Sequence, residues 1–435
     1  MGAHRYSRNP DHIRRRNVPA PDNQAMDDHL EKLLSPLVYE QQSYYRSLGL
    51  RERILTLPLM VAAVVTLLWS QVPSVSELTR MLNHKDLLWA KAVKVRQQSL
   101  SERFLSFPAV LFERVFAALI PVLKHRWHER TRPIPPSIEY GLKHFQQILA
   151  VDGSVLEALF RKLDSLQDIA PGTLAGKMCT VIELTTHLPV KIWFNANAKA
   201  HDCCFWDDLL SWVSAKTLLV LDRGFYDFDQ WAQLIQQQVD FICAGKSNLV
   251  YSVVTVFSAT DRFKDQLIQL GQDSQGQPLL TLRLIEVRKG KGWYRYLTSV
   301  IAPEVLPPYV VVDLYCRRWR IEEAFLITKR LLGLAYLWTG SLNGIQLQIW
   351  ATWLMYAVLV DLSDAVAEAV QLPLERISME MLWRGLYYFN DAYQNGKAVD
   401  PVTYFAAPEN RDLGVIKVQR KPPKELDFRP FFGST

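Results

Sequence analysis

The sequence lacks the features that mark disulfide-rich, zinc-stabilised or exported proteins. It holds only five cysteines in 435 residues, with no Cys-x-x-Cys pair and no histidine partners at zinc-ligand spacing. This argues against a disulfide scaffold and a structural zinc site, so reduced thiols are expected. The basic N-terminal segment is not followed by an apolar stretch, which predicts no signal peptide. We therefore expect a cytoplasmic protein.

Long hydrophobic runs and a strong charge of one sign are also scarce. The run 57–69 is too short to cross a membrane, and the run 345–362 is interrupted by Gln346 and Gln348, so a buried core helix is expected there. A hydrophobic content of 49% excludes a disordered chain. The formal net charge is only +6, so contacts with a nucleic acid would come from local basic patches.

One run, YCRRWRIEEAFLITKR, concentrates chemically useful side chains. Tyr315, Arg318, Glu322 and Lys329 follow one another at offsets of 3, 4 and 7 residues. On a single α-helix these positions fall within an arc of roughly 60°. A carboxylate flanked by cations suits a metal ion and a phosphate group. The alternative is an amphipathic helix with ordinary i, i+4 salt bridges.

Two aspartates follow short apolar runs that read as buried strands. Asp152 comes after 148–151 and precedes Gly153, and Asp222 comes after 218–221 and precedes Arg-Gly. An acid at the end of a buried strand needs a cation nearby. Each could also be a simple turn or capping residue. Together with Glu322 they predict three converging carboxylates, whose mutual repulsion divalent metal ions would remove.

With these residues in view, the chain resembles the DDE transposases of bacterial insertion sequences, and more narrowly the insertion-sequence-four family. The resemblance rests on Asp152, Asp222 and Glu322, and on the spacing Tyr315-x2-Arg318-x3-Glu322-x6-Lys329. It implies two Mg²⁺ or Mn²⁺ ions held by the three acids. It also implies phosphate contacts from Arg318, Lys329 and Tyr315, and a homodimer that cuts transposon ends by way of a hairpin and joins them to target DNA.

The expected fold class is α/β. Three strands (148–151, 178–184 and 190–194) are followed by a helix (203–213), a strand (218–221), a helix (228–237) and a further strand (240–244), an order that resembles an RNase H-like core. The predicted segments are a flexible basic N-terminus (1–30), a helical DNA-binding region (31–140), the first part of the catalytic core (141–244), a β-rich insertion (245–307), the second part of the core with the Glu322 helix (308–395) and a basic tail (396–435).

Local signals refine this outline. Two Ser-x-x-Glu patterns, beginning at Ser74 and Ser99, predict helix starts. The basic stretch 124–136 is predicted to be a linker or a phosphate-contacting loop. His201 and Asp202 are interpreted as helix-entry residues, although a histidine at this point could lie near a metal site.

The predicted insertion interleaves cations with aromatic rings in RKGKGWYRYLTS. Arg288, Lys289, Lys291 and Arg295 could neutralise phosphates, while Trp293 and Tyr294 could stack on bases. By the resemblance, Tyr294 stands where a flipped base is received, and Trp293 would face the other side of the strand. The alternative is a strand whose aromatic residues cover a small core.

Two other functions remain open from the sequence. One is a metal-dependent nuclease of RNase H-like fold that cleaves DNA without joining it. The other is a domesticated transposase relative that only binds DNA, against which the full set of acids argues.

Overall fold

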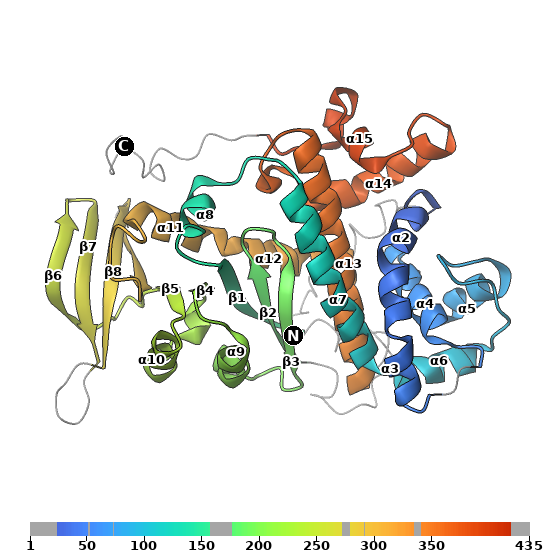
Figure 1. The fold of residues 1–435 in the computed structure, drawn as a ribbon, viewed down its shortest axis with the longest axis horizontal. Helices are drawn as coiled ribbons and strands as arrows, with labels where there is room; N and C mark the ends of the chain where they lie inside the picture. Colours follow the sequence, from blue (N-terminus) through green and yellow to red (C-terminus); the bar gives the residue numbers. More distant parts are fainter. Residues whose placement is uncertain are drawn as a thin grey trace, which may run out of the picture. The chain divides into compact units, whose positions relative to one another are not determined.

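The computed structural model describes residues 24–50, 53–72, 74–156, 176–271, 279–290, 292–334 and 341–418. The chain divides into two compact units (Figure 1). Among the described residues, the helical unit is built from those within 24–132 and 326–418, and the sheet unit from those within 133–156 and 176–325. Both ends of the described chain thus contribute to the helical unit, whereas the sheet unit comes from the middle.

The helical unit combines helices from two distant parts of the sequence. Its elements are α2 (Gln24–Glu40), α3 (Gln42–Ser47), α4 (Leu57–Trp69), α5 (Val75–His84), α6 (Gln97–Ser106), α7 (Ala109–Glu129), the π-helix η4 (Ile327–Leu331), α13 (Leu342–Ala369), η5 (Leu374–Arg376), α14 (Met379–Gln394), α15 (Pro401–Ala406) and η6 (Pro408–Leu413).

Helix α13 forms the core of this unit. It contacts α4, α6, α7, α14 and α15, and Figure 1 shows α7 running beside it. By length and composition α13 passes for a membrane span, as does the bent pair α6 and α7 taken together. However, 94% of the most apolar window of α13 is buried inside the structure. The prediction of a buried core helix over 345–362 is confirmed.

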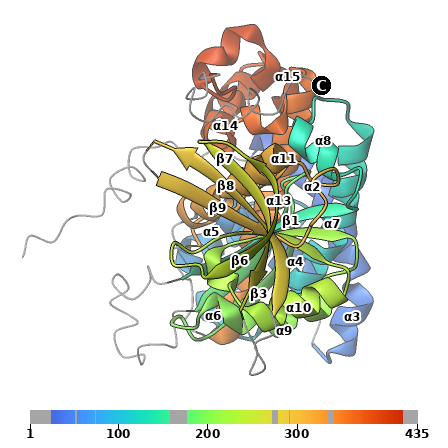
Figure 2. The same cartoon turned by 90° about the vertical axis from the view of Figure 1, so that its left-hand side faces the viewer.

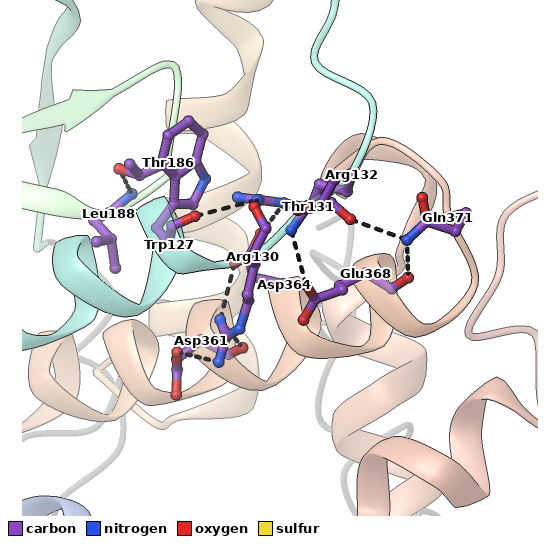
Figure 3. A network of polar contacts seen from close by, with 10 residues as sticks. All are labelled: Trp127, Arg130, Thr131, Arg132, Thr186, Leu188, Asp361, Asp364, Glu368 and Gln371. Carbon is purple, nitrogen blue, oxygen red and sulfur yellow. Dashed lines mark hydrogen bonds and ion pairs between the residues drawn. The ribbon is translucent and has the colours of Figure 1, made fainter.

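A network of buried charges joins the C-terminal end of α7 to α13 (Figure 3). Arg130 forms ion pairs of 2.8 Å with Asp361 and 2.9 Å with Asp364, while Arg126 also pairs with Asp361 and Arg132 with Asp364. Both acidic side chains are only 2% exposed, so each needs these partners. Three arginines of the stretch 124–136 are therefore bound inside the unit, where the sequence suggested a linker or a phosphate-contacting loop.

Of the two helix starts predicted from the Ser-x-x-Glu patterns, one is confirmed. The hydroxyl of Ser74 caps α5 by accepting a hydrogen bond from the Glu77 N–H at 3.1 Å. The second is wrong, because α6 already begins at Gln97 with Arg96 as its N-cap, so Ser99 lies within its first turn.

The sheet unit contains one mixed sheet of nine strands in the order β3-β2-β1-β4-β5-β9-β8-β7-β6. The pairs β1–β4 and β4–β5 are parallel and all others are antiparallel. The strands are β1 (Gln147–Val155), β2 (Lys177–Glu183), β3 (Pro189–Asn195), β4 (Thr217–Leu221), β5 (Asp240–Ala244), β6 (Tyr251–Ala259), β7 (Phe263–Leu270), β8 (Leu280–Lys289) and β9 (Gly292–Thr298). Figure 2 looks onto the β6 end of the twisted sheet.

Helices cover both faces of this sheet. The remaining elements of the unit are α8 (Pro136–Gly141), η2 (Asp202–Phe205), α9 (Trp206–Trp212), η3 (Arg223–Phe225), α10 (Phe228–Gln236), α11 (Pro308–Arg317) and α12 (Trp319–Leu326), which ends at the unit boundary. Apolar side chains of α9 and α10, such as Leu209 and Trp231, pack on one face. Those of α8 and α11, such as Ile138 and Val311, pack on the other.

The predicted strands and helices of the sheet unit are found close to their expected bounds, with two corrections. The first concerns Asp152, which lies inside β1 and not after its end. Strand β2 continues to pair past the acid, with Asp152 opposite Thr180 and Gly153 opposite Cys179. Only the pairing of β1 with β4 stops where the strand was expected to end, at Val151 and Leu221.

The second correction concerns the helix that was expected to carry Tyr315 to Lys329 on one face. It is divided into α11, α12 and the π-helix η4, and Arg318 lies at the first break. The Arg318 N–H bonds to the Tyr315 carbonyl, and the Ile321 N–H bonds to the Arg318 carbonyl, which are tight three-residue turns. Farther on, the Leu332 N–H reaches the Ile327 carbonyl five residues back. The predicted arc of roughly 60° therefore does not extend to Lys329.

Candidate active site

Two aspartates follow the point where the parallel strands β1 and β4 stop pairing with each other. This pairing ends at Val151 and Leu221; Asp152 is the next residue within β1, and Asp222 directly follows β4. Asp152 is 5% exposed, and the side chain of Asp222 is 32% exposed. In sheets with parallel strands, this end is where ligands commonly bind.

Arg318 is the cation that these acids require. Its guanidinium contacts Asp152 Oδ2 at 2.5 Å through Nη1 and Asp222 Oδ1 at 3.2 Å through Nη2. The same Nη1 lies 3.9 Å from Glu322 Oε1, one helical turn farther along α12. One positive group thus contacts all three carboxylates that the sequence singled out. Their joint action as a metal site stays a prediction.

The electrostatic state of Asp152 reflects its burial. Loss of hydration raises the pKa of Asp152 to about 7, and the charges of Asp222 and Glu322 act in the same direction, while Arg318 opposes them. The carboxylate also accepts a hydrogen bond from the Gly153 N–H at 2.8 Å. Asp152 can therefore ionise readily only when a cation lies against it.

The three carboxylates have the right chemistry for a divalent metal ion, but they are not close enough together in this structure to hold one. Three carboxylates offer the oxygen ligands that Mg²⁺ and Mn²⁺ prefer. Yet among the described residues no group of three His, Cys, Asp or Glu side chains stands close enough to hold an ion. The guanidinium of Arg318 lies against the acids instead, so metal binding would require Arg318 to withdraw.

Tyr315 borders the same site. Its ring packs 5.2 Å from the ring of Tyr296 on β9, and the guanidinium carbon of Arg318 lies 5.8 Å from the Tyr315 ring centre. Burial raises the pKa of Tyr315 to about 12, so its hydroxyl remains a hydrogen-bond donor at neutral pH. Lys329 lies on η4, which belongs to the helical unit. Its action together with Tyr315, Arg318 and Glu322 stays a prediction.

The aromatic and basic residues expected to contact DNA lie on β8 and β9. Trp293 and Tyr294 are 37% and 50% exposed, and alternate along β9, where they face Arg288 and Val287 of β8. Arg288 is exposed. Lys291 and the side chain of Lys289 lie outside the described residues. Because both rings are exposed, the alternative in which they cover a small core is disfavoured.

Arg295 is engaged within the protein. Its Nε donates a 2.8 Å hydrogen bond to the buried Glu286, and its Nη1 donates to the Ser247 carbonyl at the same distance. A phosphate contact from Arg295 would compete with this ion pair.

One residue near the site was not recognised as part of it from the sequence. Asp202 begins η2, with His201 as the N-cap, as the helix-entry interpretation expects. Its carboxylate, however, lies against both Gly153 and Gly224, the glycines that follow Asp152 and Asp222. The only signal in the sequence is an acid about twenty residues before Asp222, and secondary structure alone explains such a residue.

Comparison with known proteins agrees with this geometry. Residues 143–358, which include all three carboxylates, match the family described as the transposase DDE domain. A protein of Sinorhizobium fredii named "Putative transposase y4zB" is 23% identical over 157 residues, which are 34% of this chain and 43% of that protein. The matched part thus spans less than half the length of this relative. The similarity to transposase DDE domains thus covers residues 143–358, just under half of the chain.

Proposed function

We propose that the protein is a transposase of the insertion-sequence-four type, which cleaves DNA at the ends of a mobile element and joins them to target DNA. The observation that carries this proposal is the contact of one cationic group with Asp152, Asp222 and Glu322. The match of residues 143–358 to the transposase DDE domain supports it. So does the strand order β3-β2-β1-β4-β5, which resembles an RNase H-like core.

Asp152, Asp222 and Glu322 are the proposed ligands of two Mg²⁺ or Mn²⁺ ions. When bound, such ions activate the attacking water or 3′-hydroxyl and stabilise the leaving oxygen of the scissile phosphodiester. Arg318 would exchange its contact with the acids for one with a phosphate near the cleaved bond. Lys329 would hold a second phosphate, and the Tyr315 hydroxyl would donate a hydrogen bond to the terminal nucleotide. These groups position the DNA for in-line attack.

DNA is the proposed partner, as transposon ends and as target, and a homodimer would hold the two ends together in the cytoplasm. The exposed rings of β9 support a role for the β-rich segment 245–307, in which Tyr294 would stack on an extruded base during hairpin formation. Arg288, Lys289 and Lys291 would neutralise nearby phosphates. The helical region 31–140 is the proposed reader of the end sequence, and 141–244 and 308–395 the catalytic parts, between the terminal segments 1–30 and 396–435.

The test is DNA cleavage by the full chain. A labelled duplex carrying the inverted repeats that flank the gene should be nicked and then joined to a second DNA in Mg²⁺, but not in EDTA. Asp152→Asn, Asp222→Asn and Glu322→Gln should each lower the rate by at least about a thousandfold while still binding the duplex. Cleavage without joining would indicate a nuclease, and binding without cleavage a DNA-binding relative. Either result would overturn the proposal.

A further inference from the structure

The Asp202 carboxylate occupies a space that exists only because two residues are glycines. A methyl group added at Gly153 would overlap Asp202 Oδ1, and one added at Gly224 would overlap Asp202 Oδ2. Gly153 directly follows Asp152, and Gly224 comes two residues after Asp222. The carboxylate is thus wedged between the two backbone segments that carry the paired acids.

A buried lysine on the neighbouring strand holds this carboxylate. Lys177 of β2 pairs with Val155 of β1, and its Nζ lies 2.8 Å from Asp202 Oδ1. The same ammonium donates a 2.8 Å hydrogen bond to the Ala200 carbonyl, two residues before Asp202. The two side chains are 10% and 19% exposed. Lys177 therefore fixes both the Asp202 carboxylate and the chain that leads to it.

We propose that Asp202, held by Lys177, is a positioning residue that sets the spacing between Asp152 and Asp222. Its effect on the ions is indirect, since the carboxylate contacts the glycines that follow the two acids. Supporting groups of this kind commonly change metal affinity about tenfold when they are altered. The inference rests on the proposed function, because the spacing matters only if the two acids share metal ions.

The test measures binding of Mn²⁺ to the full-length protein, by titration with detection of free Mn²⁺ by electron paramagnetic resonance, beside thermal unfolding. Asp202→Asn keeps the volume between the glycines but loses the ion pair with Lys177, and should weaken Mn²⁺ binding about tenfold. The double variant Lys177→Gln with Asp202→Asn replaces the ion pair by two amides that can hydrogen-bond to each other. It should recover binding to within about threefold of the wild type. Asp207→Asn removes an exposed acid of the same segment and should leave binding unchanged.

Each outcome decides between distinct roles. Unchanged Mn²⁺ affinity in Asp202→Asn overturns the inference. Equal weakening in the single and double variants also overturns it, because Asp202 would then be a direct ligand. A loss of affinity that only follows a lower melting temperature would show a structural role alone. If the wild type itself binds no Mn²⁺ while Asp152→Asn behaves identically, the proposed function fails together with the inference.

Discussion

At the scale of single residues, Arg318 defines the electrostatic balance of the site. Asp152 is almost fully buried, and a buried carboxylate without a partner is costly. Arg318 supplies that partner and, at 7% exposure, is itself buried by the contact. The arginine and a bound metal ion would therefore both stabilise the same carboxylates through their positive charge. It follows that removing one should increase the protein's dependence on the other.

Arg318→Met should lower the free energy of unfolding by about 3 kcal/mol at a pH of about 8. Without its partner, Asp152 must either stay charged in the interior or take up a proton that it does not bind in the unfolded chain at this pH. Mg²⁺ should then stabilise the variant more than it stabilises the wild type. Urea unfolding with and without Mg²⁺ measures both effects.

Arg320→Met is the matched control for this experiment. Arg320 pairs with the half-exposed Glu323 on the same helix, so its loss should cost less than about 1 kcal/mol. Equal destabilisation by the two variants, or an identical response to Mg²⁺, would contradict the role assigned to Arg318.

Asp240 offers a prediction on pH. Burial raises the pKa of Asp240 above its ordinary value of 3.8, and a 2.7 Å hydrogen bond from the Ser299 hydroxyl offsets only part of this. The folded state thus binds the proton more tightly than the unfolded state. Stability from this group is complete below a pH of 3.8 and is lost as the pH rises through the folded-state pKa.

Asp240→Asn should therefore raise the melting temperature at about pH 8 and change it little at about pH 3, where the native carboxyl is uncharged. Thermal unfolding across this pH range tests the expectation. Asp229→Asn, which removes an exposed acid from α10, controls for the loss of one negative charge. Equal destabilisation at both pH values would mean that the hydrogen bond from Ser299 dominates.

At the scale of elements, the sequence predicts the strands that carry the acids well. Strands β4 and β5 and the first half of β1 consist of nearly continuous apolar residues, the pattern of strands buried on both faces. The helix predicted over 228–237 is confirmed as α10, and the carboxylate of its N-cap Asp227 accepts hydrogen bonds from the N–H groups of Asp229 and Gln230. Such signals are local, so they can be read without knowing the fold.

What could not be predicted depends on contacts between distant residues. Nothing local ends the helix at Arg318, since the run from Tyr315 to Leu331 contains neither proline nor glycine. The break coincides with the ion pair between Arg318 and Asp152, which lie 166 positions apart. Asp202 likewise joins the site only through packing against Gly153 and Gly224. Spacing along a sequence cannot reveal such neighbours.

The edge strand β6 is expected to promote self-association of the protein in concentrated solution. It is the last strand of the sheet, and the run Tyr251–Ala259 contains no charged residue. Its side chains are exposed along nearly the whole strand, including Val253, Val254 and Val256. An exposed apolar edge strand can pair with another chain.

Val256→Lys should reduce self-association at high concentration and change the free energy of unfolding by no more than about 0.5 kcal/mol. Light scattering and urea unfolding measure the two effects. Ile235→Lys, on an exposed position of α10, adds the same charge away from the edge and is the control. If both variants reduce association equally, net charge and not the strand edge is responsible.

At the scale of the whole molecule, the described residues within 31–132 and 326–418 belong to one compact unit, whereas the sequence outline placed 31–140 and 308–395 in different segments. Helices α4, α6 and α7 pack on α13, and Arg126, Arg130 and Arg132 neutralise its buried acids. The N-terminal helices are therefore needed to bury α13, whatever DNA they contact.

A chain that begins at residue 133 should accordingly lose solubility, and not merely the recognition of an end sequence. It would expose the apolar surface of α13, at roughly 25 cal/mol per Å² of apolar area, and leave Asp361 and Asp364 without counter-charges. The measurement is the soluble fraction of the truncated chain, with and without residues 1–132 expressed as a separate polypeptide. Restoration by the separate polypeptide is expected, because packing needs the helices but not the covalent link. A truncated chain that stays monomeric and unfolds cooperatively at the melting temperature of the full protein would show that the helical region is a separable module after all.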